Sequence, residues 1–528
     1  MSLFRYRLIQ AFVVISFFAI VSRLFYLQII QGPSFYKRVK QLHQTVKSEI
    51  NRGEITDKFG KTLAMDIERY TLEYNPVANS KKENKEELAR KLGAIFEFTE
   101  SSRRLLYSKY SQTLAHNLTR EQVKLIKKIN SPSLYLRRVI TRFYPEDSFA
   151  SHILGYVDAY GTPRQGVELF FKDTLENHPE TKLQLSIDSR LQGFAEDKLL
   201  KHIDKTKSAK GSVIVMKVNT GEILAWATVP SFNPNLYQEY KLEDMKNWSL
   251  VDVYQPGSIF KTVTVSSALD SKTIDADYKF VDQGYITVDK WRIQNHDYVA
   301  GRTKPAELGL TELFQRSSNP FSAHLGLKMG KDVFYEYLVK FGIGAKTNIE
   351  LPGESSGILR DKSTWMNSDL ASTAIGQGAM SVTPIQVLAA INAIANDGVW
   401  IKPTIIKLGA ENQNLKTRVK VIDPKVAKQV QRMLADSVMK NIKEKHANAG
   451  KVEGLKIAGK TGTAQKLENG RYSGYRTVAS FIGFFPADNP KYLSLVVIDD
   501  PKTDGGWGDT VAGPLFNQVA NYCKNLYL

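Results

Sequence analysis

The sequence has almost no cysteine and no clustered metal ligands. Among its 528 residues there is one cysteine, Cys523, near the C-terminus. A single thiol excludes an intramolecular disulfide and any cysteine-based zinc site. The eight histidines form neither an HExxH motif nor a close pair. We therefore expect no metal site.

Signals of nucleic-acid binding are also missing, although the chain is strongly basic. A formal net charge of +18 is compatible with a nucleic acid, an anionic membrane surface or an anionic polymer as a neighbour. The basic runs that start at Lys81 and Lys124 are mixed with acidic or apolar residues at helical spacing, which is typical of solvated helix faces. No arginine-rich arm or known binding module accompanies them, so we expect no nucleic-acid partner.

Long hydrophobic runs are scarce, and only one is long enough to cross a membrane. Residues 8–30 are largely apolar, and at about 1.5 Å per residue they span a hydrocarbon core of about 30 Å. Arg5 and Arg7 precede this run, which favours a cytoplasmic N-terminus. No clear small-x-small cleavage site follows, so we predict an uncleaved anchor rather than a signal peptide. The rest of the chain then lies outside the cytoplasm.

The length of the chain predicts two or three domains. Residues 1–32 would form a short cytoplasmic tail and the anchor. Residues 33–180 alternate short strand-like pieces with charged helical stretches, which indicates a mixed, non-catalytic domain. The polar, turn-rich segment at 175–182 predicts a boundary, after which residues 181–528 form the second large domain.

Strand-like segments stand at both ends of this second domain, on either side of a long helical middle. GSVIVMKV and EILAWATV flank Asn219-Thr220-Gly221, which predicts a β-hairpin. TVASFIGFF and YLSLVVID, separated by PADNPK, predict a second antiparallel pair, and a helical pattern follows from about Pro514. We therefore expect an α+β fold whose antiparallel sheet is assembled from distant parts of the sequence.

A serine and a lysine stand one helical turn apart in the segment YQPGSIFK. Pro256 and Gly257 mark a helix start, so Ser258 and Lys261 share one face of the predicted helix. A serine hydroxyl is a poor nucleophile until a base takes its proton. A lysine can be that base only if burial or a cationic neighbour lowers its pKa.

Two further short motifs follow in order. RSSN contains Ser317 and Asn319, which can bring a second hydroxyl and an amide to the same pocket. GKTGT, residues 459–463, offers the positive charge of Lys460, two threonine hydroxyls, and a glycine that lets a substrate backbone approach an edge strand. Each motif alone occurs by chance, but the ordered set is the signature of class A β-lactamases and penicillin-binding proteins.

One segment imitates a nucleotide-binding site. GLKIAGKT, from Gly454 to Thr461, fits the P-loop pattern, and LVVID ending at Asp499 imitates a Walker B strand. A P-loop needs a helix N-terminus directly after it to bind phosphate. Here the following residues are interrupted by Gly470 and Gly474 and show no sustained helical face. We therefore do not predict an NTPase.

Longer segments extend the resemblance over nearly the whole chain. In the second domain they are PSFNPN (230–235), FGIGAKTNIELPGE (341–354) and IGQGAMSVTPIQ (375–386). Upstream they are RGEITDKFGKTLA from Arg52, RFYPEDSFASHILGYVD from Arg142, and GVE at 166–168. On these motifs the chain resembles the class B penicillin-binding proteins, which implies a pedestal (dimerisation-type) domain at 33–180 and a serine β-lactamase-like transpeptidase domain at 181–528. It also implies that Arg52 and Glu168 lie within salt-bridge reach.

The resemblance implies a serine-type peptidoglycan D,D-transpeptidase. Ser258 would attack the carbonyl between two terminal D-alanines, and an amine of a neighbouring stem peptide would resolve the acyl-enzyme. Lys261 would be the general base, Ser317 would relay the proton to the leaving group, and Asn319 would fix Lys261 and the substrate amide. The remaining expected site residues hold the terminal carboxylate or accommodate the substrate backbone: Lys460, Thr461, Gly462 and Thr463. The N–H groups of Ser258 and Thr463 would form an oxyanion hole.

The resemblance further implies no cofactor, and it implies stem peptides and β-lactams as ligands. The segment RTVASFIGFFPADNPKYLSLVVIDDPK, residues 476–502, is similar to division-type enzymes. We therefore expect a septal role, with a membrane glycan polymerase and divisome proteins as partners. The localisation would be single-pass in the inner membrane, with the catalytic domain periplasmic. The alternatives are an elongation-type transpeptidase, a D,D-carboxypeptidase or β-lactamase, and a β-lactam sensor.

Overall fold

The computed structural model describes residues 12, 15–23, 26, 51–76, 84–299, 301, 304–409, 418–468 and 471–528. Among these residues no helix is both long and apolar enough to cross a membrane. Most of the predicted anchor at 8–30 lies outside the described residues, so the anchor stays a prediction.

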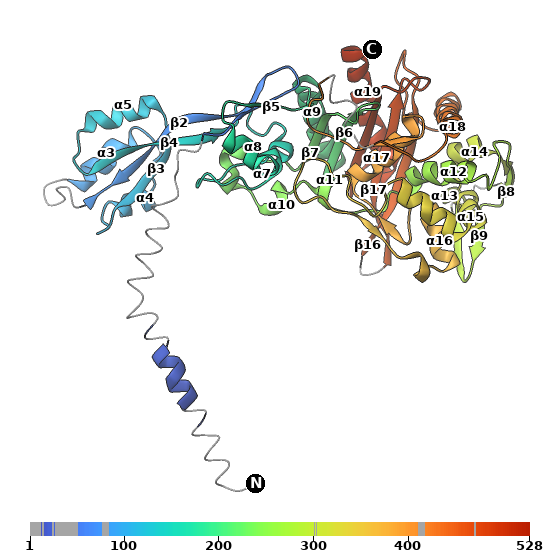
Figure 1. Cartoon of the computed structure of the whole chain (residues 1–528), viewed down its shortest axis with the longest axis horizontal. Helices are drawn as coiled ribbons and strands as arrows, with labels where there is room; N and C mark the ends of the chain where they lie inside the picture. Colours follow the sequence, from blue (N-terminus) through green and yellow to red (C-terminus); the bar gives the residue numbers. More distant parts are fainter. Residues whose placement is uncertain are drawn as a thin grey trace, which may run out of the picture. The chain divides into compact units, whose positions relative to one another are not determined.

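The chain forms two compact units, which Figure 1 shows with the element labels used below. Unit 1 contains Glu68–Thr141 and Ala159–Thr162. Unit 2 contains Arg52–Ile67, Arg142–Asp158 and Pro163–Leu528. The units follow from internal contacts, and the functional domain bounds 33–180 and 181–528 stay a prediction.

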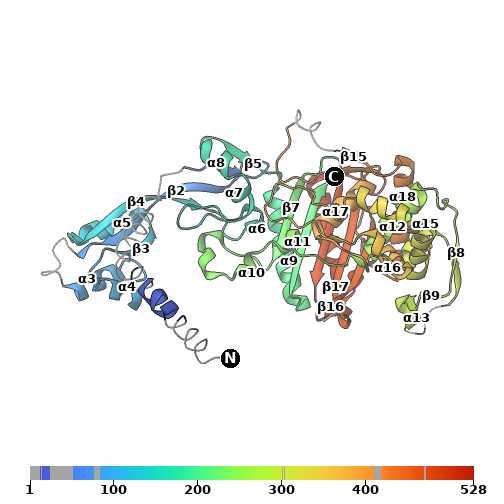
Figure 2. The ribbon, with the colours of Figure 1, turned by 60° about the horizontal axis from the view of Figure 1, so that its bottom comes forward.

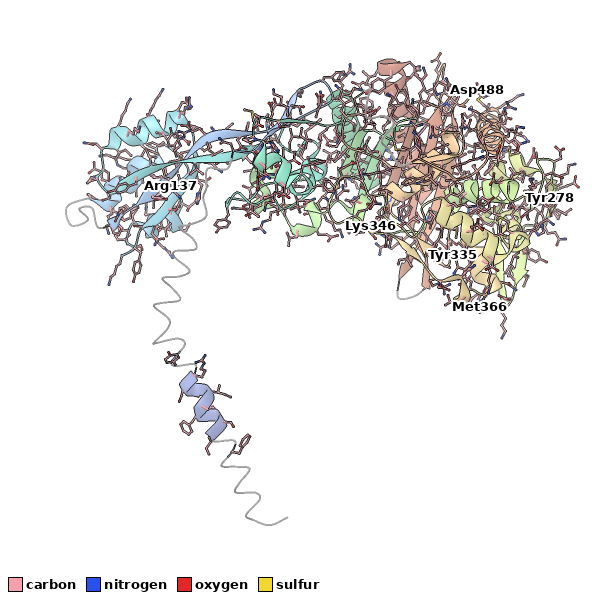
Figure 3. All side chains as sticks on the ribbon, in the orientation of Figure 1. Arg137, Tyr278, Tyr335, Lys346, Met366 and Asp488 are labelled. Carbon is pink, nitrogen blue, oxygen red and sulfur yellow. The ribbon has the colours of Figure 1, made fainter. Side chains whose placement is uncertain are left out.

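Unit 1 is a small α/β body. It contains α3 (Lys85–Gly93), α4 (Glu100–Leu105), β3 (Gln112–Leu118) and α5 (Arg120–Ile129), together with β2 (Thr62–Tyr74) from Glu68 on and β4 (Leu134–Phe143) up to Thr141. The remaining ends of β2 and β4 belong to unit 2. Both β3 and β4 pair with β2. In α5, Val123 and Ile126 are buried on one face, because residues three apart lie on the same side of a helix. Arg137 of β4 pairs with Glu73 of β2 at 2.8 Å, and it is labelled among the surface side chains in Figure 3. The helical spacing of the basic runs from Lys81 and from Lys124 is confirmed by α3 and α5, as far as the structure describes those runs.

Unit 2 is built on a five-stranded sheet in the order β16-β17-β18-β6-β7 (Figure 2). The strands are β6 (Lys210–Lys217), β7 (Ile223–Val229), β16 (Ala458–Glu468), β17 (Arg471–Phe485) and β18 (Tyr492–Asp499). All neighbours in this sheet are antiparallel. Both predicted strand pairs are confirmed, and β18 joins them by pairing with β6.

Helices cover both faces of this sheet, because successive residues of a strand point to opposite faces and both sets are apolar here. Val213 and Val215 of β6 pack with α9 (Ser189–Thr206) and α19 (Gly513–Tyr527) in one hydrophobic cluster. Ile214 and Met216, the intervening residues, belong to the larger cluster that contains the helical middle of the chain. The predicted α+β architecture, an antiparallel sheet flanked by helices, is therefore confirmed.

The helical middle consists of η4 (Gly257–Phe260), α12 (Lys261–Asp270), α13 (His296–Val299), α14 (Leu310–Arg316), α15 (Asn319–Lys340), η5 (Lys362–Thr364), α16 (Asn367–Ala374), α17 (Pro384–Ala395) and α18 (Pro424–Lys443). Short antiparallel pairs lie among these helices: β8 (Phe280–Asp282) with β11 (Ala306–Leu308), β9 (Tyr285–Val288) with β10 (Trp291–Gln294), β12 (Ile358–Leu359) with β13 (Met380–Ser381), and β14 (Val399–Ile401) with β15 (Arg418–Lys420). The other elements of unit 2 are β1 (Glu54–Thr56), α6 (Ser151–Leu154), α7 (Gly166–Phe170), α8 (Lys172–Asn177), β5 (Lys182–Gln184), η3 (Pro234–Glu239), α10 (Leu242–Met245), α11 (Trp248–Val251), η7 (Asp504–Gly506) and η8 (Gly508–Ala512).

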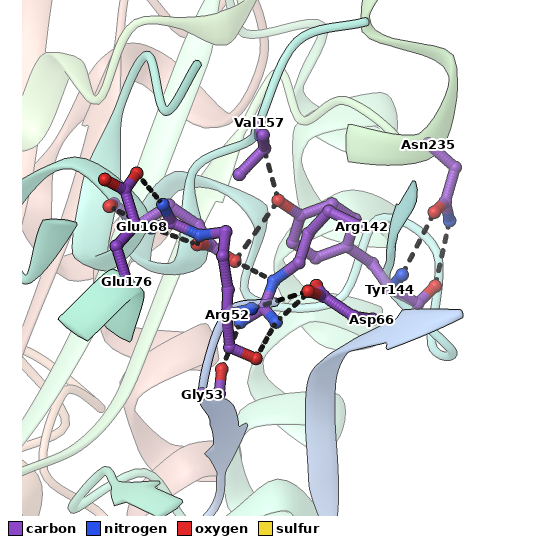
Figure 4. A network of polar contacts seen from close by, with 9 residues as sticks. All are labelled: Arg52, Gly53, Asp66, Arg142, Tyr144, Val157, Glu168, Glu176 and Asn235. Atoms are coloured by element: carbon purple, nitrogen blue, oxygen red, sulfur yellow. Dashed lines mark hydrogen bonds and ion pairs between the residues drawn. The ribbon is translucent and has the colours of Figure 1, made fainter. Parts of the chain in front are cut away.

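A buried network of ion pairs joins three segments of unit 2 (Figure 4). The Arg52 side chain donates through Nε to Glu168 Oε2 at 3.1 Å, which confirms the predicted pair. Arg142 Nε donates to the other oxygen, Glu168 Oε1, at 2.6 Å, and Arg142 also pairs with Asp66 at 2.9 Å. Arg52 further pairs with Glu176. Each of the two arginines thus has two carboxylate partners.

Candidate active site

Ser258 lies in a tight turn at the start of the buried helix α12. The sequence predicts one helix there, but η4 has 3₁₀ geometry and α12 begins only at Lys261. In 3₁₀ geometry residues three apart are eclipsed, so Ser258 and Lys261 are stacked on one side of the turn. Ser258 is partly exposed, whereas Lys261 is fully buried.

The side-chain nitrogen of Lys261, in the first motif, contacts two residues of the second motif. Its Nζ donates to the Ser317 carbonyl oxygen at 2.5 Å, to Ser317 Oγ at 3.1 Å and to Asn319 Oδ1 at 2.6 Å. Ser317 has a left-handed backbone with φ 54° and ends α14, so the chain turns sharply before Asn319 starts α15. This turn directs the carbonyl and the two side chains at one lysine.

Burial lowers the pKa of Lys261 well below its ordinary value, and the nearby charge of Lys460 lowers it further, while Asp282 acts in the opposite direction. The hydrogen-bond partners of Lys261 are neutral oxygens. A buried amine without a direct counter-ion loses its proton readily. Lys261 therefore meets the requirement that the sequence sets for a lysine acting as a base.

The third motif lies in β16, the edge strand of the sheet. Lys460 is buried and donates to the carbonyl and to the hydroxyl of Thr461, each at 3.2 Å. Burial lowers the pKa of Lys460 to about 7. Thr463 Oγ1 accepts a hydrogen bond from the Gly508 N–H at 3.0 Å. The strand continues through the motif and is followed by β17, so the helix that a P-loop needs is missing here.

Two glycines let β16 approach the turn that carries Ser258. Gly257 has φ +56°, and a Cβ on it would lie 2.9 Å from the Thr463 carbonyl oxygen. A Cβ on Gly462 would lie 3.0 Å from the Pro256 carbonyl oxygen. The Gly257 N–H also donates to the Gly376 carbonyl at 3.0 Å. The backbone of Thr463 therefore runs alongside the Ser258 turn, which is the arrangement that a shared oxyanion hole requires.

The residues that support Asn319 were not predicted from the sequence. The Asn319 side chain donates through Nδ2 to the Gln294 carbonyl at 2.8 Å, and its backbone N–H donates to Asn295 Oδ1 at 2.8 Å. Both supporting residues come from the segment around β10, more than twenty residues upstream. Among the described residues, no group of three or more His, Cys, Asp or Glu side chains is positioned to hold a metal ion.

Family models match the two large parts of the chain. The model described as penicillin binding protein transpeptidase domain matches residues 211–521. The model described as penicillin-binding protein dimerisation domain matches residues 47–206. The chain therefore belongs to the penicillin-binding proteins, in the class B group of septal type.

Curated relatives match over almost the full length. Stage V sporulation protein D of Bacillus subtilis is 30% identical, covering 96% of this chain and 83% of the relative. Peptidoglycan D,D-transpeptidase FtsI of Escherichia coli K12 is 27% identical, covering 98% of this chain and 90% of the relative. The prediction of a serine-type D-Ala-D-Ala transpeptidase is confirmed by these matches, and the alternatives are not favoured.

Solved structures share the fold. Penicillin-binding protein 3 of Mycobacterium tuberculosis, solved with aztreonam, has a TM-score of 0.69 at 24% identity and covers 90% of this chain and 96% of its own. A peptidoglycan synthetase of Bifidobacterium adolescentis has the same TM-score at 25% identity, with 90% and 95% covered.

Proposed function

We propose that this chain cross-links peptidoglycan stem peptides during septal wall synthesis through an acyl-serine formed on Ser258. The hydroxyl of Ser258 attacks the carbonyl between the terminal D-alanines, and D-alanine leaves. The amine of a second stem peptide then attacks the acyl-enzyme and restores the serine. No cofactor enters these steps.

Proton transfer in this scheme runs through Lys261 and Ser317. The neutral amine of Lys261 takes the proton of Ser258 as the hydroxyl attacks. Ser317 Oγ lies 3.1 Å from the lysine nitrogen, close enough to receive that proton. Ser317 then gives a proton to the departing D-alanine nitrogen. Asn319 holds the amine through its Oδ1 at 2.6 Å and orients the substrate amide.

The third motif recognises the C-terminal carboxylate of the stem peptide. Protonated Lys460 supplies the positive charge, and the hydroxyls of Thr461 and Thr463 donate hydrogen bonds. Because Thr463 Oγ1 accepts from the Gly508 N–H, its own proton stays available for the carboxylate. Gly462 has no side chain to obstruct the substrate backbone at the strand edge.

The observation that carries the proposal is the buried lysine held by neutral oxygens of the second motif. Treatment with a labelled penicillin, followed by intact-mass measurement and peptide mapping, should show one adduct on Ser258 that is absent in Ser258→Ala. Ser266→Ala is a matched control. Ser266 lies in α12, the helix that follows Ser258, and its hydroxyl donates to the Thr262 carbonyl within that helix. An adduct on Ser317 would contradict these roles.

The cellular setting belongs to the same proposal. Residues 1–32 would anchor the chain in the inner membrane with 33–180 as the pedestal and 181–528 as the transpeptidase domain in the periplasm. A membrane glycan polymerase and divisome proteins would be its partners, since neither matched domain makes glycan. A fluorescent fusion should gather at midcell. A uniform signal along the side wall would contradict the septal setting and leave the chemistry untouched.

A further inference from the structure

Asp282, the last residue of β8, is a buried carboxylate beside the catalytic turn. It is 4% exposed. Its Oδ1 accepts from the Gly284 N–H at 2.7 Å, and its Oδ2 accepts from Asn295 Nδ2 at 2.9 Å and from Ser318 Oγ at 2.6 Å. Within the described parts of the chain, no ion pair to Asp282 is formed at 4.0 Å or less. A buried carboxylate is costly unless such donors replace its water.

Two of these donors lead directly to the second motif. Ser318 stands between Ser317 and Asn319, and its hydroxyl also accepts from the Phe321 N–H as the N-cap of α15. Asn295 accepts from the Asn319 N–H while it donates to Asp282. The carboxylate therefore holds the turn at Ser318 directly and at Asn319 through Asn295.

We propose that Asp282 is a positioning residue for acylation, which fixes the Ser317–Asn319 turn against Lys261 and places a buried negative charge behind that turn. The inference rests on the proposed role of Lys261 as the base. Asp282 touches neither the substrate nor Ser258 in this proposal and acts through Ser318 and Asn295.

The charges around Lys261 explain why such a carboxylate is useful. Lys460 lowers the pKa of Lys261 in addition to burial, and Asp282 raises it. The remaining groups in contact with the amine, Ser317 and Asn319, are neutral. An amine whose pKa falls too far is a weak proton acceptor, because catalysis by a general base follows its basicity. Asp282 opposes that fall without forming an ion pair that would keep the lysine protonated.

Three variants separate charge from contact. The readout is the second-order rate constant of acylation by a fluorescent penicillin between pH 4 and 9, where the acid limb reports proton loss from the base. Asp282→Asn removes the charge, so the acid limb should move to lower pH by about half a unit or more, and the plateau should fall about tenfold or more. Ser318→Ala keeps the charge, so the plateau should fall while the acid limb stays. Asp188→Asn, which changes a buried aspartate paired with Lys58 and Arg190, should change neither.

Each outcome decides a part of the proposal. An unmoved acid limb in a folded Asp282→Asn variant would refute the role of the charge. A normal plateau of the acylation rate constant in Ser318→Ala would refute the positioning role. This test still decides the matter if thermal melting shows that Asp282→Asn does not fold. Failure of the proposed function itself is distinguishable, because the unmodified protein would then form no adduct on Ser258.

Discussion

Unit 2 buries positive charge in two places, with opposite consequences. Around Arg52 and Arg142, each guanidinium lies within ion-pair distance of two carboxylates (Figure 4). Around Lys261 and Lys460, the contacting groups are carbonyl, amide and hydroxyl oxygens. The four cationic side chains are all nearly inaccessible to solvent.

The difference in partners decides whether the buried group keeps its proton. Burial by itself would lower the pKa of Arg142. Glu168 has the largest opposing effect, followed by Tyr144 and Asp66, and together they raise this pKa above its ordinary value. Burial lowers the pKa of both lysines, and in the described part of the chain the hydrogen-bond partners of the two amines are uncharged oxygens. The arginine network therefore keeps its charges and holds segments of unit 2 together, whereas the lowered pKa values suit the roles proposed for the two lysines in proton transfer and carboxylate binding.

The first way to break this contrast is to remove the carboxylate shared by the two arginines. Glu168→Gln leaves Arg52 and Arg142 buried with fewer negative partners, which should lower the free energy of unfolding by about 3–5 kcal/mol in urea denaturation. The acylation plateau of the folded fraction should be unchanged. Glu336→Gln is the control, because its pair with Lys340 is exposed and should contribute far less to the free energy of unfolding. Equal losses in the two variants would show that the buried network does not hold unit 2 together.

The second prediction replaces the proposed base, Lys261, with a side chain that stays protonated. Lys261→Arg keeps the positive charge but cannot accept the proton of Ser258 at neutral pH. Acylation by penicillin should fall by at least about 10²-fold in stopped-flow measurements. Lys210→Arg is the matched control, since Lys210 is paired with Asp252 at 2.7 Å and keeps its charge in this variant. The acylation rate of the Lys210→Arg variant should stay normal. Near-normal acylation by Lys261→Arg would remove this residue from the role of base.

The sequence predicts the parts of the site that depend on local spacing. Ser258 and Lys261 are three residues apart, and such a pair shares a face in either helix type. The same spacing does not distinguish an α-helix from the 3₁₀ turn that the structure has, because proline followed by glycine starts both. The hairpin predicted around Asn219-Thr220-Gly221 likewise depends on local sequence, and the antiparallel pairing of β6 with β7 confirms it.

The support of the site depends on contacts through space, which spacing does not reveal. Asp282 reaches Ser318 across 36 residues, and Asn295 reaches Asn319 across 24. Both come from short strands or their ends, where no sustained periodicity marks a residue as buried. The pairing of Arg52 with Glu168 was predictable only because the resemblance to the family relates the two motifs. Local chemistry is thus evident in the sequence, whereas the network that holds it follows from the fold.

The smallest effect concerns Lys460, whose pKa of about 7 in the free protein sets a limit on carboxylate recognition. Below pH 7 this lysine is protonated and, in the proposed function, attracts the carboxylate of a penicillin. Above it the protonated fraction decreases about tenfold per pH unit, so the second-order rate constant of acylation should decrease about tenfold between pH 8 and 9. Lys460→Arg stays protonated throughout this range, so its rate constant should be flat to pH 9, even if its level is lower because the guanidinium is larger. Stopped-flow acylation at low penicillin concentration measures both profiles. If the rate constant of Lys460→Arg decreases in the same way above pH 7, the decrease reports the titration of another group. The difference between buried cations with and without carboxylate partners would then not explain how the third motif binds a carboxylate.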